Sequence, residues 1–141
     1  MIDQEYLFVY GTLRRGFNHP VVTLLERGAN FVGMGYYQGQ LYDVGPYPAV
    51  VASSRTGDTV VGDVYALHPD PTELLSRLDA YEEYFPNNHA QSLYLRQKEP
   101  IRDRSGIVHH AWVYLYARPT AHLRRIESGD YLEYLKLKAL S

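Results

Sequence analysis

The alternation of apolar and polar positions divides the chain into short strands and a few helices. Residues 6–10 form a short apolar run, which is typical of a strand buried on both faces. Residues 30–44 are rich in Gly and Tyr with partial period-two alternation, which predicts twisted or bulged strands. Similar runs predict further strands at residues 49–52, 59–67, 92–102 and 108–117.

Apolar positions spaced three and four residues apart predict a helix over residues 70–82. Shorter helices are expected at 18–28 and at 131–140. Strands outnumber helices, so the pattern indicates an α+β protein with a small, strongly curved, barrel-like mixed sheet and flanking short helices. Because no repeat or linker interrupts the pattern, we expect residues 1–141 to form a single domain.

The start of the 70–82 helix carries three residues with known positional preferences. Asp70 is expected as the N-cap, Pro71 as the first helical residue and Glu73 as the capping-box partner. In contrast, Arg124-Arg125 carries no such signal, and we expect these two residues on the solvated face of a helix.

Glu82 interrupts the apolar face of this helix. At about 100° per residue, the face consists of Leu74, Leu75, Leu78 and Tyr81, and Glu82 falls inside it. A partly buried carboxylate loses hydration, which raises its pKa toward the range useful for proton transfer. The periodicity leaves a simpler alternative open, in which Glu82 frays at the helix end or pairs with an arginine.

The first strand ends in a second unusual feature, the sequence Tyr10-Gly11-Thr12-Leu13. Gly11 permits a backbone conformation that other residues resist, and it lets a ligand approach the main chain closely. Successive N–H groups after such a turn can form a concave anion site. Taken alone, the motif is more common as a plain turn from strand to loop.

Composition narrows the classes of function. The net charge is −2 with both signs interspersed, which argues against nucleic acid as a partner. The chain has no cysteine and no histidine spacing that suits a metal site, so we expect no metal and no other cofactor. The N-terminal residues lack the pattern of a secretion signal, and every apolar run is far shorter than a membrane span. We therefore expect a cytoplasmic protein; its oligomeric state is not indicated.

Seven short motifs follow one another along the chain: Tyr-Gly-Thr-Leu-Arg at 10–14, Tyr-Pro-Ala at 47–49, Gly-Asp-Val-Tyr at 62–65, Leu-Asp-Ala-Tyr-Glu at 78–82, Tyr-Leu-Arg at 94–96, Ala-Trp-Val-Tyr at 111–114 and Ser-Gly-Asp-Tyr at 128–131. Their order and spacing resemble the γ-glutamylcyclotransferase-like family, which includes AIG2-like proteins and γ-glutamylamine cyclotransferases. The resemblance spans essentially the whole chain and implies a compact barrel with flanking helices and a cavity near one end.

The resemblance also implies roles for individual residues. Glu82 corresponds to the family's acid/base residue, and the Tyr10–Leu13 loop to the main chain that binds the γ-glutamyl group. Tyr94 and Arg96 are expected to contact the substrate as well, although a structural role in the sheet accounts for each equally well. Asp79 is expected as a structural hydrogen-bond acceptor.

Two positions depart from the family pattern. Glu83 stands where a Gly usually follows the catalytic Glu, and Asp63 stands where many members have Glu. The Glu83 substitution bears directly on the backbone turn that orients Glu82.

The implied reaction cyclises a γ-glutamyl amine or peptide to 5-oxoproline and releases the free amine. The substrate's own α-amine attacks its γ-carbonyl, while Glu82 takes a proton from that amine and returns one to the leaving amine. Main-chain N–H groups of residues 11–13 would stabilise the oxyanion. The alternative is a non-catalytic protein that binds a small carboxylate or amide in the same cavity; a weaker one is an interaction role through the aromatic surface. The identity of the leaving amine is not indicated.

Overall fold

The computed structural model describes residues 4–11, 13–14 and 20–140, which contain seven strands and three α-helices. The strands are β1 (Tyr6–Val9), β2 (Ala29–Asp43), β3 (Pro48–Ala52), β4 (Thr59–Leu67), β5 (Tyr94–Asp103), β6 (Val108–Tyr116) and β7 (Arg124–Arg125). The helices are α1 (Pro20–Gly28), α2 (Thr72–Tyr81) and α3 (Tyr131–Leu140), with one 3-10 turn, η1, at His89–Gln91. Strand β4 and helix α3 have the bounds that the hydrophobic pattern predicts.

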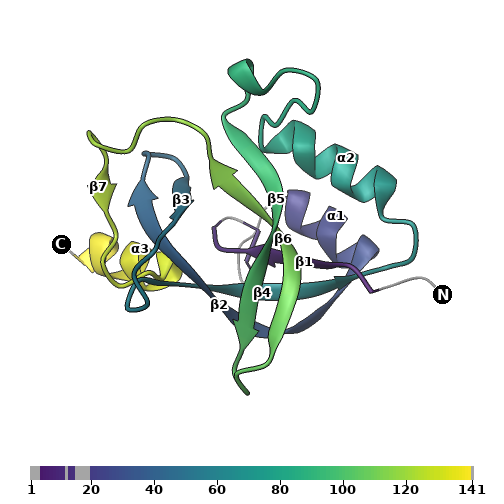
Figure 1. Cartoon of the computed structure of the whole chain (residues 1–141), viewed down its shortest axis with the longest axis horizontal. Coiled ribbons are helices and arrows are strands. Elements are labelled where there is room, and N and C mark those ends of the chain that lie inside the picture. The colour runs from purple at the N-terminus through teal and green to yellow at the C-terminus, as the bar shows by residue number, and fades with distance from the viewer. Residues whose placement is uncertain (1–3, 12, 15–19, 141) are drawn as a thin grey trace.

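Five strands close into a barrel. β4 pairs antiparallel with both β2 and β1, β1 pairs parallel with β6, and β6 pairs antiparallel with β5. Strand β5 then returns to β2 through the pairing of Gly35 with Asp103 and of Tyr37 with Ile101. β3 and β7 pair with the other half of β2 and extend the sheet beyond the barrel (Figure 1). This mixed, closed sheet confirms the predicted α+β class and barrel-like curvature.

Strand β2 makes the closure possible because it is long and strongly curved. Its register against β4 shifts between Phe31 and Gly33, which confirms the predicted bulge. Gly35 of β2 pairs with Gly62 of β4 where the strands cross closely. A Cβ on Gly62 would lie 2.4 Å from the carbonyl oxygen of Val9, so a larger residue there would push β1 away.

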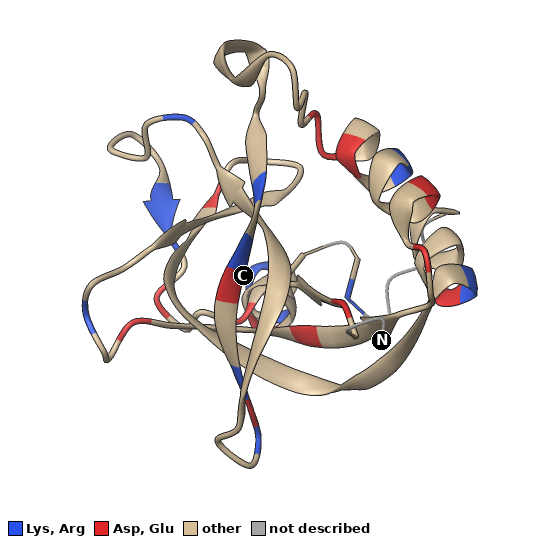
Figure 2. Ribbon diagram, turned by 45° about the vertical axis from the view of Figure 1, so that its right-hand side comes forward, with Lys and Arg blue, Asp and Glu red and all other residues tan. Residues whose placement is uncertain are grey.

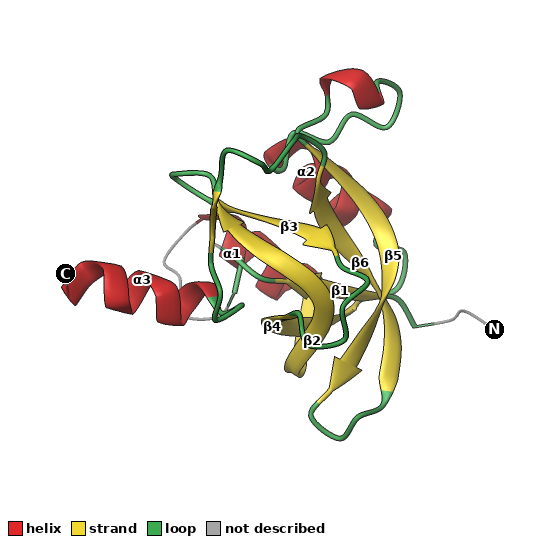
Figure 3. Ribbon diagram, turned by 60° about the vertical axis from the view of Figure 1, so that its left-hand side comes forward, coloured by secondary structure: helices red, strands yellow, loops and turns green. Residues whose placement is uncertain are grey.

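The apolar core forms two layers on opposite faces of the sheet. From β1, Leu7 and Val9 pack with buried side chains of α1 and α2, and Phe8 and Tyr10 point into the other cluster, which fills the barrel. This arrangement confirms that β1 is buried on both faces. Helices α1 and α2 lie on one side of the barrel, and α3 lies on another and joins the inner cluster through Tyr131 (Figures 1 and 3).

The expected capping of α2 is wrong. The helix begins at Thr72 with Pro71 at the N-cap, and no side chain caps its first turn. Asp70 has a left-handed backbone with φ of 56°, and its carboxylate accepts a hydrogen bond from the Thr72 hydroxyl at 2.9 Å. Glu73 instead pairs with Arg77, one turn ahead, at 2.9 Å. The N-cap needs an extended backbone, which the conformation of Asp70 does not supply.

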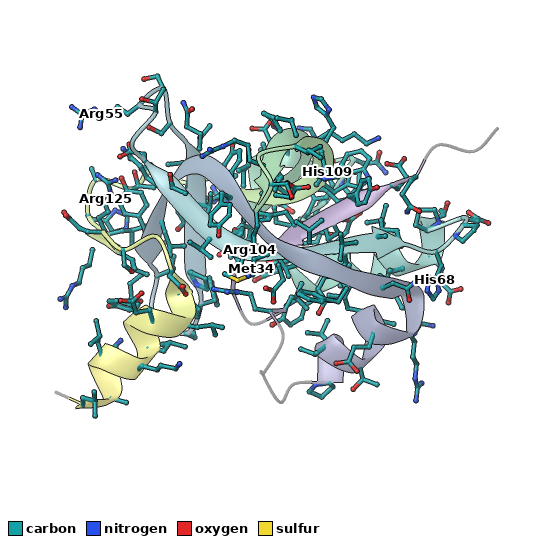
Figure 4. All side chains as sticks on the ribbon, turned by 90° about the horizontal axis from the view of Figure 1, so that it is seen from below. Met34, Arg55, His68, Arg104, His109 and Arg125 are labelled. Carbon is teal, nitrogen blue, oxygen red and sulfur yellow. The ribbon has the colours of Figure 1, made fainter. Side chains whose placement is uncertain are left out.

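Residues 124–125 form strand β7 and not the expected helix face. They pair with Tyr42 and Asp43 of β2, and Arg125 Nη2 lies 2.8 Å from Asp58 Oδ1. Figure 4 shows Arg125 near the end of the molecule that carries α3. Nothing in the local sequence indicates this pairing, because its partners lie more than sixty residues away. None of the helices in the described ranges combines the length and the apolar character needed to cross a bilayer.

Candidate active site

A cavity of about 220 Å³ opens where the end of β1, the start of β3 and the end of α2 meet β5 and β6. It is smaller than the roughly 300–1,000 Å³ of sites for drug-sized ligands, so it suits a ligand or group of amino-acid size. Its walls are mainly aromatic and aliphatic. The lining residues are Phe8, Val9, Tyr10, Gly11, Leu13, Tyr47, Pro48, Tyr81, Glu82, Glu83, Leu93, Tyr94 and Tyr114.

Glu82 reaches this cavity because it continues the buried face of α2. Its N–H donates to the carbonyl oxygen of Leu78 at 2.9 Å, so Glu82 is the C-cap and holds the helical position that the periodicity predicts. Leu74, Leu75 and Leu78 are buried against the barrel, as predicted. Tyr81 is predicted on the same buried face, but 39% of its surface is exposed because it lies at the last residue of α2, where the helix reaches the edge of the core.

Burial sets the protonation of Glu82. Loss of hydration raises the pKa of this carboxyl group from its ordinary 4.5 to about 8. The charge of Glu82 in turn adds to burial in raising the pKa values of Tyr10 and Tyr94, which places the carboxylate among the aromatic walls. No Lys, Arg or His is found among the described residues that line the cavity. At neutral pH, the protonated form of Glu82 therefore predominates in the free protein.

The tyrosine walls are fixed by hydrogen bonds to neighbouring main-chain carbonyl groups and to Asp79. The Tyr10 hydroxyl donates to the carbonyl oxygen of Tyr114 at 2.5 Å, and the Tyr94 hydroxyl donates to that of Pro48 at 2.6 Å. The Tyr114 hydroxyl donates to Asp79 Oδ1 at 2.7 Å. Burial raises the pKa of each phenol further above 10, so these groups remain neutral donors. Such rings cannot reorient freely, and they give the cavity a defined shape.

Arg96 lies behind the cavity wall and is not among the residues that line it. Its Nε and Nη2 donate to the two oxygens of Asp79 at 2.7 Å and 3.1 Å, and its guanidinium stacks 4.5 Å from the centre of the Trp112 ring. Asp79 is thus the hydrogen-bond acceptor that its position predicts. Arg96 is connected to the cavity through Asp79 and the Tyr114 hydroxyl.

The loop after β1 places Gly11 and Leu13 in the cavity wall; Thr12 lies outside the described residues. The Arg14 N–H donates to the carbonyl oxygen of Gly11 at 3.0 Å and closes a turn. Gly11 does not adopt a left-handed backbone, so conformational freedom is not why the site needs glycine. Space is the reason, because an added Cβ would lie 2.8 Å from Pro48 Cγ.

A family model described as gamma-glutamyl cyclotransferase, AIG2-like, matches residues 7–133. The chain belongs to this family. A protein of Methanocaldococcus jannaschii named as a candidate gamma-glutamylcyclotransferase is 32% identical over 133 residues, which cover 92% of this chain and 98% of that protein. The gamma-L-glutamyl-butirosin B gamma-glutamyl cyclotransferase of Niallia circulans is 35% identical over 132 residues, which cover 90% of this chain and 70% of that protein.

Solved structures of the family share the fold. The crystal structure of a mouse AIG2-like protein superposes with a TM-score of 0.65 at 22% identity, covering 89% of this chain and 88% of that chain. The barrel, its outer strands and the three helices are therefore those of the γ-glutamylcyclotransferase-like fold.

The turn that follows Glu82 is formed without a glycine. Glu83 adopts the left-handed conformation with φ of 55° and donates its N–H to the carbonyl oxygen of Ala80 at 3.2 Å. The N–H of Tyr84 donates to the carbonyl oxygen of Asp79 at 2.9 Å. These two bonds form a Schellman motif, in which glycine is the usual left-handed residue. Glu83 therefore occupies the position that glycine usually takes in this motif, at the cost of some strain.

Arg14 is a further residue beside the cavity, to which the sequence pattern assigns no role. It is only 4% exposed, and its Nη1 lies 2.9 Å from Asp130 Oδ1, while its Nε lies 3.8 Å from Asp63 Oδ1. Asp130 also caps the start of α3 by accepting the N–H groups of residues 132 and 133. The arginine thus ties the loop after β1 to both β4 and α3. Its position directly after the family's loop motif is the sole sequence signal for this role.

The charged residues outside the cavity form no metal centre in the part of the chain that the structure describes. Lys and Arg are spread among Asp and Glu over most of the fold (Figure 2). His68 and His109 lie well apart in Figure 4, and His109 is paired with Asp103 at 2.9 Å.

Proposed function

We propose that this protein is an enzyme that cyclises a γ-glutamyl amine or peptide to 5-oxoproline and releases the free amine. The observation that carries the proposal is the Glu82 carboxyl group in an aromatic cavity, with its pKa raised to about 8 by burial. Family membership supports it, because one relative at 35% identity is named as a γ-glutamyl cyclotransferase.

The reaction exchanges one amide bond for another within the substrate. The nitrogen of the α-amine attacks the γ-carbonyl carbon, the five-membered ring closes, and the original bond to the leaving nitrogen breaks. Glu82 accepts the proton that the attacking amine must lose and donates a proton to the leaving amine, so the enzyme returns to its starting state. Holding the two reacting groups in one conformation supplies much of the rate, since the attack is intramolecular.

The raised pKa of Glu82 suits this double role. A carboxyl group with a pKa of about 8 lies much closer to an amine in proton affinity than an ordinary carboxyl group with a pKa of 4.5, so proton transfer between Glu82 and the amine costs less free energy. A bound ammonium would also favour the ionised form of Glu82, because opposite charges at short range stabilise each other. Substrate binding would thus convert the carboxylic acid of the free protein into the required base.

The remaining site residues are proposed to hold the substrate. The main-chain N–H groups of the Gly11–Leu13 segment would bind the γ-glutamyl group and the oxyanion, and the ring of Tyr94 would form a wall against it. The hydroxyl of Tyr94 already donates its hydrogen to Pro48, so toward substrate it could act only as a hydrogen-bond acceptor. Arg96 would support the site through Asp79 and Tyr114.

Release of 5-oxoproline from a panel of γ-glutamyl amides, followed by mass spectrometry, tests the proposal. Glu82→Gln should lower turnover by about 10²–10⁴-fold, the usual contribution of a general acid/base. Glu73→Gln removes a surface carboxylate from the same helix and should leave turnover unchanged. If no 5-oxoproline forms above the level of Glu82→Gln, the enzymatic function is wrong. Equal thermal stabilisation of both proteins by small carboxylates or amides, without turnover, would then support the binding alternative.

A further inference from the structure

The cavity has a buried end and a solvent end. Tyr10, Gly11 and Pro48 are buried, and they form the end next to the loop after β1. Tyr81 and Glu83 are exposed, and they line the same cavity where it meets solvent. In the proposed reaction the γ-glutamyl group occupies the buried end. The leaving amine must therefore extend past Tyr81 and Glu83.

This solvent end is acidic and aromatic. After burial, the charge of Glu83 is the largest cause that raises the pKa of the half-buried Tyr47, so the carboxylate lies within electrostatic reach of that phenol. The Glu83 carboxylate forms no ion pair with any of the residues that the structure describes. The Glu83 carboxylate and the rings of Tyr47 and Tyr81 line the same cavity, so a cation that enters it is attracted by the carboxylate charge and by the ring faces.

The position of Glu83 is held by the backbone. Its left-handed conformation is part of the Schellman motif, so its Cα is fixed beside Glu82. Glycine would form the same turn with less strain, but it would present no charge at the cavity. A strained residue that lines a binding cavity indicates a role for its side chain there.

We infer that the cavity prefers γ-glutamyl amides whose leaving amine carries a second positive charge, as a diamine or polyamine does, and that Glu83 is the residue that determines this specificity. The inference rests on the proposed cyclotransferase reaction. The second charge takes no part in bond making or breaking, so Glu83 attracts it equally in the ground state and the transition state. Its effect therefore falls on KM and leaves kcat nearly unchanged.

Two γ-glutamyl amides of equal length provide the test. In one the leaving amine is diaminopentane, and in the other it is hexylamine, which replaces the distal ammonium with a methyl group. At low salt the wild type should favour the cationic amide by about fivefold in kcat/KM, through KM, and the preference should shrink as ionic strength rises. Glu83→Gln should bring the ratio close to one.

Two further variants separate charge from folding. Glu83→Asn is also neutral, and asparagine tolerates the left-handed backbone, so it should abolish the preference in a stably folded protein. Glu73→Gln removes one surface charge from the other end of α2 and should keep the wild-type ratio. A wild-type ratio near one, or a ratio that survives in both Glu83 variants, would overturn the inference while leaving the cyclotransferase reaction intact.

If neither amide is turned over, the proposed function is refuted, but the role of Glu83 can still be tested by affinity. Calorimetry would then give the Kd of each amide for wild type and Glu83→Asn. Tighter binding of the cationic amide by wild type alone supports the role of Glu83, and equal affinities in both proteins refute it.

Discussion

Arg14 and Asp130 form an ion pair of 2.9 Å that joins the loop after β1 to the residue that caps the start of α3. The arginine side chain is 5% exposed and also lies 3.8 Å from Asp63, whose side chain is 5% exposed. Arg14 therefore connects the loop after β1 to β4 and to the start of α3. These contacts lie next to the main chain that is proposed to bind substrate. A buried charge that loses its partner is costly, because the remaining charge keeps its desolvation penalty.

Removing the arginine should destabilise the protein and loosen the site. We expect Arg14→Met to lower the free energy of unfolding by about 3 kcal/mol, because Asp63 and Asp130 both lose their cationic partner. Denaturant titration measures the change. Arg77→Met is the matched control: its pair with Glu73 is largely exposed, and the loss should be below about 1 kcal/mol. Equal losses in the two variants would contradict this account of Arg14.

The sequence could predict the features that depend on local periodicity, and it could not predict those that depend on long-range pairing. The strand at residues 59–67 and the helix at 131–140 follow from local periodicity, and the structure has both. The position of Glu82 also follows from periodicity, since it depends only on α2. The pairing of Gly35 with Asp103 that closes the barrel could not be derived from local pattern, which indicated only a strongly curved, barrel-like sheet.

The errors have a local cause at Asp70 and long-range causes at the other positions. The N-cap assigned to Asp70 fails because its backbone is left-handed, and residues 124–125 form a strand because β2 offers a free edge beside them. The sequence pattern assigned no role to Arg14 because its partners, Asp63 and Asp130, lie some 50 and 116 residues away in the chain. For Arg14 and for residues 124–125 the deciding contact is invisible to a short window of sequence.

A methyl group at position 11 should disturb the cavity wall. In Gly11→Ala the new Cβ would lie 2.8 Å from Pro48 Cγ, so Pro48 must move, and its carbonyl oxygen holds the Tyr94 hydroxyl. We expect a loss of about 1–2 kcal/mol in stability and weaker substrate binding, seen as a higher KM. Gly57→Ala, where an added Cβ meets nothing within 4 Å, should change neither quantity. Unchanged KM in Gly11→Ala would contradict the close packing.

The strain at Glu83 predicts a stabilising substitution. Glu83→Gly should raise the free energy of unfolding by about 0.5–1 kcal/mol, because glycine adopts a φ of 55° without a Cβ clash. Glu83→Ala separates backbone from charge: it removes the carboxylate but keeps the clash, so it should give no such gain. Thermal or denaturant unfolding of the three proteins measures the differences. A gain in the alanine variant equal to that in the glycine variant would assign the effect to charge.

The pKa of Glu82 predicts how stability depends on pH. In the unfolded chain this carboxyl group loses its proton near pH 4.5, and in the folded protein near pH 8. Between these values the folded state binds the extra proton, so the contribution of Glu82 to stability is greatest below about pH 4.5 and falls as the pH rises to about 8.

The slope of that fall is at most about 1.4 kcal/mol per pH unit, and Glu82→Gln, which cannot ionise, should lack it. Denaturant unfolding of wild type and variant at pH 5, 7 and 9 measures the difference. The variant should gain stability relative to wild type with each step up to about pH 8, since wild type must then bury a charge without a cationic partner in the cavity. Curves that stay parallel from pH 5 to 9 would show that Glu82 titrates in the folded protein as it does in the unfolded chain, and the carboxyl group would then not be the poised proton carrier that the cyclisation requires.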